Sequence, residues 1–599
     1  MPDGADHTSA RDWQDPSTYR AGTADLLARL RAFDGSAPAA EQHRVLAELA
    51  AYARADEGMY APTTTLSGDI VASFHEHLRH IAALLDPEVI RSHPGLAPSL
   101  RLGLLGLRTG EPLHTAPRRQ TDVGRGLDRV SYLVTGTPAE TSEALHRKTR
   151  AIELIGASIT SERILWVPTG SAVAVTGSRE VDLPPEPATA QSTLAKARGR
   201  SPLALARTVL HDRALLRRSR RADVAKRYAG AWLLMDRDTF AQDNAEHLYR
   251  HLLAHEPDVN AYFVLRRESN DWQRLQDDGF RLIPYGSDEY YLALLHCAHL
   301  ISSQVDGYVV RPLLGHLLGP QRWRYTFLQH GVIIHDLSRW LNIKPIDLMV
   351  TSAPGEHASV VGDGTHYELT DLEVKQVGLA RHDRLVRLGP QTTRRRMLVT
   401  PTWRSELLEP QTDGNRRGLL PDFWSSRYAS EWAGLLSSPE LKAICERAGW
   451  QITFMPHPNM QDYLDSSPLP QHVSTVRFDS VDVQQVFAEA AVWVTDFSSL
   501  GNEAAVLRCP VVYFQFDRDE FYQGRLYQQS WWSYRDDGFG PVTGTREEAI
   551  DAIRAIATDG VDPVYLARMD AAIPLRDGRN CERTVEAIRA INAPVRSAL

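Results

Sequence analysis

The sequence predicts an α/β protein in which two doubly wound, Rossmann-like halves face one another, preceded by a helical region and a small β-rich domain. The first observation is that, from residue 229, short apolar runs alternate with segments of helical periodicity. The second is that this alternation occurs twice, over 229–395 and 396–599, which predicts two halves. The third observation is size: 599 residues suffice for about three to five domains, and 43% hydrophobic residues are typical of a globular chain.

The first 183 residues divide into two predicted regions. Region 1–115 is predicted to be helical, because apolar residues recur at spacings of three and four within 41–55 and 70–86. Region 120–183 is β-rich and is expected to form a small sandwich. Its apolar runs, separated by Gly, Ser, Thr and Pro, are 130–134, 151–155, 164–167 and 172–175.

The segment 184–228 is predicted to be a linker followed by a basic amphipathic stretch. Residues 196–227 include eleven Lys or Arg against Asp212 and Asp223, a local charge of +9 in a chain whose net charge is -8. Five apolar residues could form a stripe along it: Leu203, Val209, Leu210, Leu215 and Leu216. Two interpretations remain open, an anionic membrane surface as partner or a solvated connector helix. The acidic net charge argues against nucleic acid as a partner.

The two halves contain twelve predicted strands. Those of the first half are 232–235, 262–265, 282–284, 300–302, 326–328, 348–350 and 374–377, and those of the second are 397–400, 452–455, 476–478, 492–495 and 511–514. Helices are expected at 242–254, 288–298, 422–447, 481–490 and 499–508. Two such halves enclose a cleft, and ligands of open parallel sheets bind beyond the carboxyl ends of the strands.

Five strand ends carry groups suited to phosphate chemistry. They hold His330 with Gly331, Arg381 with Asp383, Arg404, His457, and Asp496 with Ser498 and Ser499. The His330 imidazole can accept a proton near neutral pH, and Gly331 permits close approach of a substrate. His457 lies between two prolines that fix the backbone on either side. A structural histidine bonded to backbone is the alternative for both.

Arg404 and the two serines have competing interpretations. Arg404 could clamp a phosphate with two hydrogen bonds, or pair with an acid such as Glu406 or Glu503. Ser498 and Ser499 follow a strand and open a predicted helix, so they could bind a phosphate there or simply cap the helix.

Other motifs are excluded or discounted. The chain has no Walker-type glycine loop, no GxSxG and no HExxH, which removes the common nucleotide hydrolase, serine hydrolase and zinc protease classes. The Asp-Arg-Asp runs 236–238 and 517–519 are interpreted as turn caps, so no metal and no cofactor is predicted. Four dispersed cysteines indicate reduced thiols. We expect neither a signal peptide nor a membrane-spanning segment.

Over about 225–595 the sequence resembles the CDP-glycerol glycerophosphotransferase family, which includes teichoic acid and capsule polymerases. The ordered motifs that carry the resemblance are Trp232, Asp236-Arg237, Asp243-Asn244, His330-Gly331, Gly378, Arg381-His382-Asp383, 401–404, His457-Pro458, 496–499 with Glu503, 510–517, 538–541, Asp577-Gly578 and Arg583. The resemblance implies a GT-B fold and transfer of a phosphopolyol from a CDP-activated donor to a hydroxyl of a polymer or lipid-linked primer. It also implies release of CMP at the cytoplasmic membrane face.

The resemblance assigns roles to the strand-end residues. His330 is expected to be the general base, and His457 the second catalytic residue. Substrate-binding residues are expected to be Gly331, Arg381, Asp383, Arg404, Asp496, Ser498, Ser499 and Glu503. The first half is expected to bind the acceptor and the second the CDP donor.

The sequence departs from the family pattern at two places. Residues 332–336 stand where many members have a Thr-Pro, which bears on the identity of the acceptor or the polyol. Glu503 stands where Asp is frequent, which keeps the carboxylate on a longer side chain. Two rivals remain, a CMP-sugar transferase of the polysialyltransferase type and a non-catalytic polymer-binding scaffold at the membrane. The sequence does not indicate the oligomeric state.

Overall fold

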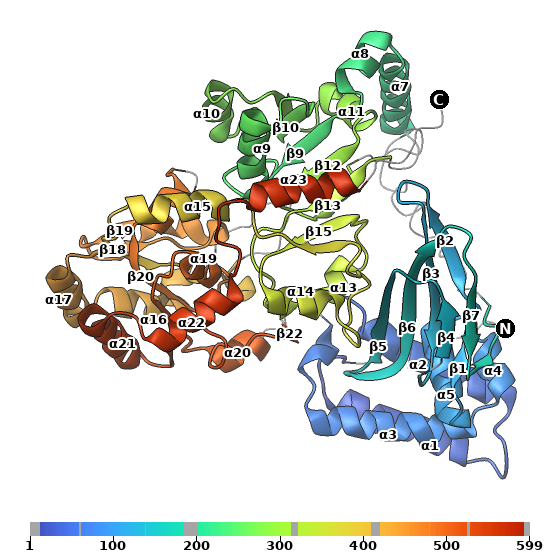
Figure 1. The fold of residues 1–599 in the computed structure, drawn as a ribbon. Coiled ribbons are helices and arrows are strands. Elements are labelled where there is room, and N and C mark those ends of the chain that lie inside the picture. The colour runs from blue at the N-terminus through green and yellow to red at the C-terminus, as the bar shows by residue number, and fades with distance from the viewer. Residues whose placement is uncertain are drawn as a thin grey trace.

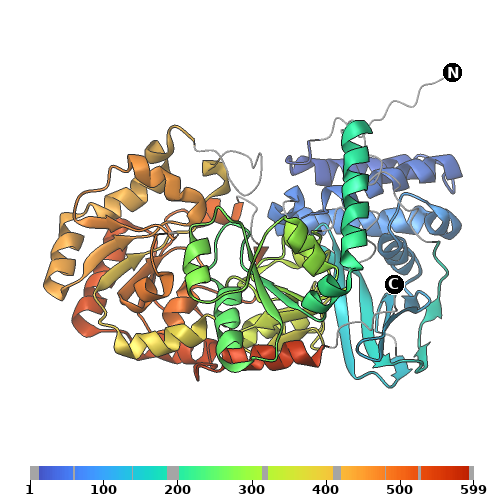
Figure 2. The same cartoon turned by 90° about the horizontal axis from the view of Figure 1, so that it is seen from above.

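The structure is a computed structural model and describes residues 12–58, 61–137, 139–184, 202–312, 322–408, 420–478, 480–523 and 528–591. The chain forms three parts in order (Figures 1 and 2). The first is the helical and β-rich N-terminal part, the second is built on a seven-stranded parallel sheet, and the third is built on a six-stranded parallel sheet. This is a mixed α/β architecture.

The N-terminal part begins with helices and continues as a sheet. The helices are α1 (Ser17–Arg31), α2 (Ala39–Ala55), η2 (Pro62–Thr65), α3 (Gly68–Leu84), α4 (Pro87–Ser92) and α5 (Pro98–Thr109). The strands are β1 (Leu113–His114), β2 (Arg118–Asp122), β3 (Leu127–Val134), β4 (Ala139–Ser142), β5 (His146–Leu154), β6 (Ala157–Pro168), β7 (Val173–Thr176) and β8 (Arg179–Glu180). Helices α2 and α3 lie at the predicted 41–55 and 70–86.

The sheet of the N-terminal part has the order β5-β6-β3-β1-β8, with β2 paired to β3, while β4 and β7 form a separate pair. Burial alternates along β3, as expected for a strand with one face in a core. On the helical side, Leu113, Leu154 and Ile155 join the core formed by α1 to α5. The helical region and one side of the sheet therefore share a hydrophobic core, while the buried residues of β3 and β6 form a second cluster with β7.

The N-terminal part docks on the seven-stranded part through β5. Lys148 is fully buried, and its ammonium donates to the carbonyl oxygens of Val360 and Leu369, the latter at 3.0 Å. Burial lowers the pKa of Lys148 to about 7. Buried charged groups of this kind need specific partners, so the contact fixes how the two parts sit together.

A histidine joins the same two parts near β14 (His335–Asp336). His366 lies 2.7 Å from Asp336 through Nδ1 and 3.0 Å from Glu153 of β5 through Nε2. Hydrogen bonds to Asp336 and then Glu153 raise the pKa of His366 to about 10. The imidazolium therefore bridges two carboxylates of different parts of the chain.

The basic segment forms α7 (Pro202–Ser219) and α8 (Ala222–Tyr228), which lie beside α11 (Asp288–Leu294) (Figure 1). Leu215 is buried in the core, whereas Leu210 is 64% exposed. These two members of the predicted apolar stripe thus lie in different surroundings, and the side chain of Leu203 is outside the described residues, as are Lys196, Arg198 and Arg200. Among the helices that the structure describes, none is both long and apolar enough to span a membrane.

The seven-stranded sheet has the order β11-β10-β9-β12-β13-β15-β16. Its strands are β9 (Trp232–Met235), β10 (Ala261–Leu265), β11 (Leu282–Pro284), β12 (His299–Ser302), β13 (Arg324–Phe327), β15 (Leu348–Thr351) and β16 (Val374–Gln376), close to the predicted ranges. Its helices besides α11 are α9 (Asn244–His255), α10 (Asp271–Asp277), α12 (Gly307–Val310), α13 (Ser338–Leu341), α14 (Pro354–Val361), α15 (His382–Leu388) and η3 (Gly389–Gln391).

The six-stranded sheet has the order β19-β18-β17-β20-β21-β23. Its strands are β17 (Arg396–Val399), β18 (Gln451–Phe454), β19 (Val473–Thr475), β20 (Ala490–Thr495), β21 (Val511–Phe514) and β23 (Val542–Thr543). Its helices are η4 (Ser405–Leu407), η5 (Phe423–Ser425), α16 (Arg427–Leu436), α17 (Pro439–Ala448), η6 (Pro458–Ser466), α18 (Val483–Ala488), α19 (Gly501–Val506), α20 (Arg518–Gln523), α21 (Arg546–Asp559) and α22 (Pro563–Ala572).

Two predicted elements of this part need correction. The strand predicted at 476–478 lies earlier, at β19, because Val473, Ser474 and Thr475 pair with β18. The single helix predicted at 422–447 is two helices, α16 and α17. The Ser438 hydroxyl accepts the backbone N–H of Leu441 and Pro439 follows, so α17 has its own start.

The chain returns to the seven-stranded part at its last described helix, α23 (Asn580–Ala590). Cys581, Val585 and Ile588 pack with residues of β9, β10 and α9 in one core. Figure 1 shows α23 lying across the seven-stranded part, where it packs beside α9. The helix that precedes it in the sequence, α22, belongs to the six-stranded part. Residues 580–591, which the sequence analysis placed in the second half, therefore complete the core of the first.

Candidate active site

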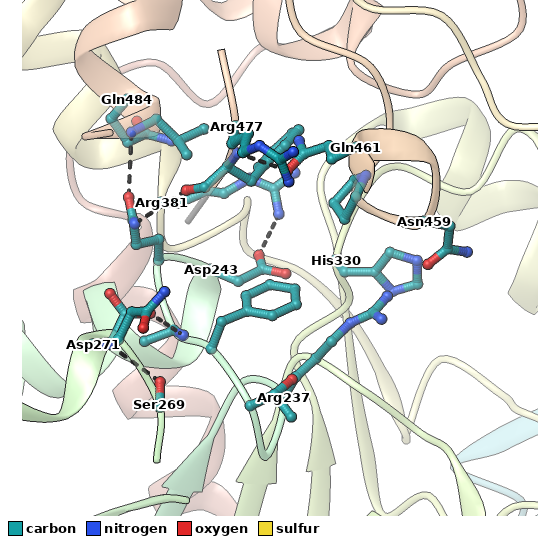
Figure 3. A pocket seen from close by; sticks show the side chains of 18 of the residues that line it. Arg237, Asp243, Ser269, Asp271, His330, Arg381, Asn459, Gln461, Arg477 and Gln484 are labelled. Carbon is teal, nitrogen blue, oxygen red and sulfur yellow. Dashed lines mark hydrogen bonds and ion pairs between the residues drawn. The ribbon is translucent and has the colours of Figure 1, made fainter. Parts of the chain in front are cut away.

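A cavity of about 540 Å³ lies between the two parallel sheets, at the carboxyl ends of their strands. One wall is formed by segments that follow β9, β10, β13 and β16, and the other by segments that follow β18 and β19. Figure 3 shows Arg237, Asp243 and His330 from the first wall and Asn459 and Gln461 from the second. This edge is where open parallel sheets bind ligands.

His330 lines the cavity at the end of a constrained loop. The preceding Gln329 has a left-handed φ of 62°, which costs a non-glycine residue about 1–3 kcal/mol. Its carbonyl accepts a 2.7 Å hydrogen bond from Asn244, and its side-chain amide donates to Glu356 at 3.0 Å. Glu356 also accepts the backbone N–H of Ile333 at 2.7 Å. Residues on both sides of His330 are thus held by buried hydrogen bonds.

The walls of the cavity keep His330 neutral near physiological pH. Partial desolvation by the surrounding protein lowers the pKa of His330, whose side chain is still exposed to the cavity; Arg237 and Arg381 add to this, while Asp243 and Asp306 oppose it. A neutral imidazole can accept a proton. His330 is therefore suited to act as a general base.

His457 has a different hydrogen-bonding state. Its Nδ1 accepts the backbone N–H of Asn459 at 3.2 Å, which places the proton of the neutral ring on Nε2. Burial, with Arg237 and His330 nearby, lowers the pKa of His457 to about 3. His457 does not itself line the cavity, although Pro458 and Asn459 do. The ring is a hydrogen-bond donor rather than a proton acceptor.

Arg381 links the two walls. Its guanidinium lies 2.5 Å from Asp243, at the start of α9, and also pairs with the buried Glu503 of α19. Burial would raise the pKa of Glu503, but Arg381 outweighs it and holds that pKa well below its ordinary value. Arg381 borders the cavity, whereas Glu503 lies behind it. The pair fixes the two parts at the base of the cavity.

Asp383 points away from the cavity. Its carboxylate oxygens accept the backbone N–H groups of Asn580 and Cys581, each at 2.8 Å. The residue is buried and does not border the cavity. Its contacts anchor the start of α23, whereas the sequence predicts a substrate contact for this residue.

Arg404 and Asp496 also lie away from the cavity. The Arg404 guanidinium lies 2.9 Å from Asp496 and 2.9 Å from Asp517, and donates to the carbonyl oxygen of Thr402 at 2.8 Å. It is 3% exposed. Of the two interpretations of Arg404, the geometry favours pairing with acids, here Asp496 and Asp517 rather than Glu406 or Glu503. This buried network ties β17, β20 and β21 together.

The two serines occupy different positions before α19. The Ser498 hydroxyl accepts the backbone N–H of Leu500 at 3.2 Å, and the helix itself begins at Gly501 rather than 499. Ser499 contacts the first wall: a Cβ on Gly331 would lie 2.6 Å from its hydroxyl oxygen. A side chain at 331 would therefore displace the Ser499 hydroxyl, and Ser499 lies directly beside the residue that follows His330.

Several residues of the cavity are not among the site residues predicted from the sequence, including Arg237, Asn459, Gln461 and Arg477. Arg237 directly follows β9, the same strand-end signal that identified His330. It was discounted because 236–238 was interpreted as a turn cap. Asp236 does have a capping role, because its carboxylate accepts the backbone N–H groups of Asp243, Ala245 and Glu246 at the start of α9.

Comparison with known proteins identifies relatives of this arrangement. Residues 217–590 match the model of the family described as CDP-Glycerol:Poly(glycerophosphate) glycerophosphotransferase. The minor teichoic acid biosynthesis protein GgaB of Bacillus subtilis (strain 168) is 29% identical over 365 residues, which cover 60% of this chain and 39% of that protein. The chain thus matches about two fifths of this relative's length.

Two solved structures are more distantly similar. A variant of the wall teichoic acid polymerase TagF aligns with a TM-score of 0.46 at 14% identity, covering 64% of this chain and 97% of the other. The Methanocaldococcus jannaschii UDP-GlcNAc 2-epimerase aligns with a TM-score of 0.36 at 12% identity, covering 60% and 99%. The family match spans more than half of the sequence and includes both walls of the cavity. The chain therefore belongs to the CDP-glycerol:poly(glycerophosphate) glycerophosphotransferase family.

Proposed function

We propose that this protein transfers a phosphopolyol, glycerol phosphate or a similar unit, from a CDP-activated donor to a hydroxyl of a teichoic-acid-like or capsule polymer or its lipid-linked primer. The observation that carries the proposal is the position of His330, a neutral imidazole on a constrained loop, in a cavity between the two parallel sheets. The family match supports the reaction class.

In the proposed step His330 removes the proton of the acceptor hydroxyl while its oxygen attacks the phosphorus that carries the polyol. The new P–O bond forms as the bond from that phosphorus to the bridging oxygen breaks, and CMP leaves with the electron pair. His457, with its proton on Nε2, offers a hydrogen bond to phosphate oxygen. The general base is His330 rather than His457, because Nδ1 of His457 is already occupied by Asn459.

The two sheet-based parts would act as the halves of a GT-B enzyme. We assign the acceptor to the first half, 229–395, and the CDP donor to the second, 396–599, with residues 580–591 structurally part of the first. Asn459 and Gln461 belong to the donor-side wall. Ser498 and Ser499 remain proposed donor-phosphate ligands because Ser499 lies against Gly331.

We also propose a location for the reaction, the cytoplasmic face of the cell membrane. Arg213, Arg217 and Arg220 on the basic segment are exposed and have no ion pair to another described residue, so they are available to anionic lipid headgroups. The N-terminal part, 12–184, would act as an accessory module on the acceptor half.

A donor screen tests the proposal. Purified protein is incubated with a polymer primer and CDP-glycerol, CDP-ribitol or CMP-sialic acid, and CMP release is measured. We expect CMP from a CDP-polyol only. Release from CMP-sialic acid alone would assign the protein to the polysialyltransferase-like class, and primer binding without CMP from any donor would indicate a non-catalytic scaffold.

A further inference from the structure

Four arginines line the cavity, and three of them have acid partners. Arg266 lies 2.5 Å from Asp238, Arg381 pairs with Asp243 and Glu503, and Arg477 lies 2.6 Å from Asp465 and 3.3 Å from Asp462. Arg237 has no ion pair within the part of the chain that the structure describes. A guanidinium in a partly enclosed cavity without a counter-ion is suited to bind an anionic ligand.

The surroundings of Arg237 indicate where that ligand lies. Its guanidinium carbon is 5.3 Å from the centre of the Phe240 ring, which supports the side chain from one side. Its charge reaches both histidines, since it contributes to lowering the pKa values of His330 and His457. In Figure 3 the Arg237 side chain extends toward the His330 imidazole. The cation therefore lies toward the His330 ring and acts electrostatically on the His457 ring as well.

We propose that Arg237 binds the phosphate group that is transferred, holding its non-bridging oxygens between His330 and His457. This inference rests on the proposed function and adds a substrate-binding residue to it. Arg237 exchanges no proton in the step: the acceptor proton goes to His330, and the electron pair of the broken P–O bond leaves with CMP. Its planar guanidinium offers two parallel N–H donors, which match two phosphate oxygens.

The inference has an electrostatic consequence that a merely structural arginine would lack. The charged groups that act on His330 are Arg237 and Arg381, which lower its pKa, and Asp243 and Asp306, which raise it. Removing the Arg237 charge raises the pKa of His330 in the free enzyme. The acid limb of log(kcat/KM) against pH, which reports a base in the free enzyme, then moves to higher pH.

Three variants test this. Arg237→Gln removes the charge, Arg237→Lys keeps the charge but not the two parallel donors, and Arg118→Gln changes an exposed arginine of β2 as a control. We expect Arg237→Gln to bind CDP-glycerol at least tenfold more weakly in calorimetry and to shift the acid limb upward. We expect Arg237→Lys to lose affinity with the limb unchanged. Thermal melting of all three should match the wild type.

Each outcome has one meaning. If wild-type protein releases CMP but Arg237→Gln binds CDP-glycerol within twofold of it and keeps the same acid limb, Arg237 is not a phosphate ligand. If Arg237→Gln instead melts well below the wild type, and Arg237→Lys restores melting without any loss of affinity, its role is structural and the inference is wrong. If wild-type protein releases CMP from no donor, the proposed function fails. Binding of CDP compared with cytidine in the same variants then still tests the phosphate contact by itself.

Discussion

At the residue scale, two histidines of one site are suited to different tasks, and His330 is among the groups that lower the pKa of His457. His330 lies on the cavity wall and has a lowered pKa, while His457 accepts a backbone N–H on Nδ1 and has a pKa of about 3. Proton transfer needs a base whose pKa is near the working pH. The difference in surroundings, rather than the shared residue type, separates the proposed base from the proposed donor of a hydrogen bond.

Replacing the proposed base should reduce turnover without preventing donor binding. His330→Ala is expected to lower kcat by about a hundredfold or more, the usual scale for a general base, with CDP-glycerol affinity nearly unchanged. Initial-rate kinetics and calorimetry measure the two effects, with the exposed His255→Ala as a control. A turnover within a few-fold of wild type would remove His330 from this role.

The two serines can be separated by single substitutions. Ser498→Ala removes the acceptor for the Leu500 N–H and should lower stability by about 1 kcal/mol. Ser499→Ala should keep the melting temperature and weaken CDP-polyol binding by about tenfold, if its hydroxyl bonds to a charged phosphate. Thermal melts and CMP titrations of the same samples measure both. Unchanged CMP affinity in both single variants would give both serines a structural role.

The structure places some predicted site residues at the cavity and others away from it, for a physical reason. His330 and Arg381 lie at the cavity because both follow strand ends, and a strand end is a local signal in the sequence. The task of Arg404 depends on Asp517, and that of Asp383 on Asn580, residues distant in sequence that only the fold brings close. Arg237 shows the strand-end signal too, but its acidic neighbours made the local pattern ambiguous.

At the scale of elements, apolar strands were located closely because a fully buried parallel strand is a short apolar run that sequence shows directly. Helix boundaries were less accurate where a break depends on one capping serine, as between α16 and α17. The return of α23 to the first sheet was not predicted, because an amphipathic helix carries no information about which core receives it.

The exposed arginines of α7 and of the turn that follows it should govern membrane association. Arg213, Arg217 and Arg220 are replaced together by Glu, which leaves the Arg218–Asp288 pair in place. Since each basic side chain near an anionic surface contributes about 1 kcal/mol at most, the variant should leave phosphatidylserine vesicles in a flotation assay at physiological salt. Neither the wild type nor the variant should bind vesicles that contain no anionic lipid.

A matched control changes the same charge elsewhere. Arg31, Arg54 and Arg447 are exposed arginines of other helices, and their replacement by Glu should leave flotation at the wild-type level. Equal flotation of the α7 variant, the control and the wild type would identify α7 as a solvated connector.

At the scale of the whole molecule, the N-terminal part is coupled to the segment that follows His330. His366 connects Glu153 of β5 to Asp336, six residues after His330. Strand β14 then pairs with β22 (Gln528–Gln529) of the six-stranded part. One short segment is therefore linked to the six-stranded part by strand pairing and, through His366, to the N-terminal part.

This bridge predicts how stability depends on pH. The folded-state pKa of His366, about 10, lies above the ordinary value of 6.5. Its stabilising effect is therefore fully present below about pH 6.5 and is lost as pH rises through about 10. His366→Gln should melt a few degrees below wild type at pH 6, and the difference should vanish near pH 10. Calorimetric melts across this range measure it.

A double-mutant cycle with Glu153→Gln provides the control. If Glu153 and His366 interact, the double variant should lose less stability than the sum of the single variants. A melting difference that is the same at pH 6 and pH 10 would show that the His366 charge does not contribute.

The position of α23 also bears on how the chain is made. The core around β9 and α9 contains Cys581, Val585 and Ile588, which a ribosome synthesises hundreds of residues after β9. At roughly 5–20 residues per second this delay amounts to tens of seconds. During synthesis the first sheet must wait with an apolar surface uncovered, while the second sheet can assemble from residues that are already present. Nascent chains should thus complete the later part of the protein before the earlier one, and chaperones that recognise apolar surfaces should engage the first sheet during that interval.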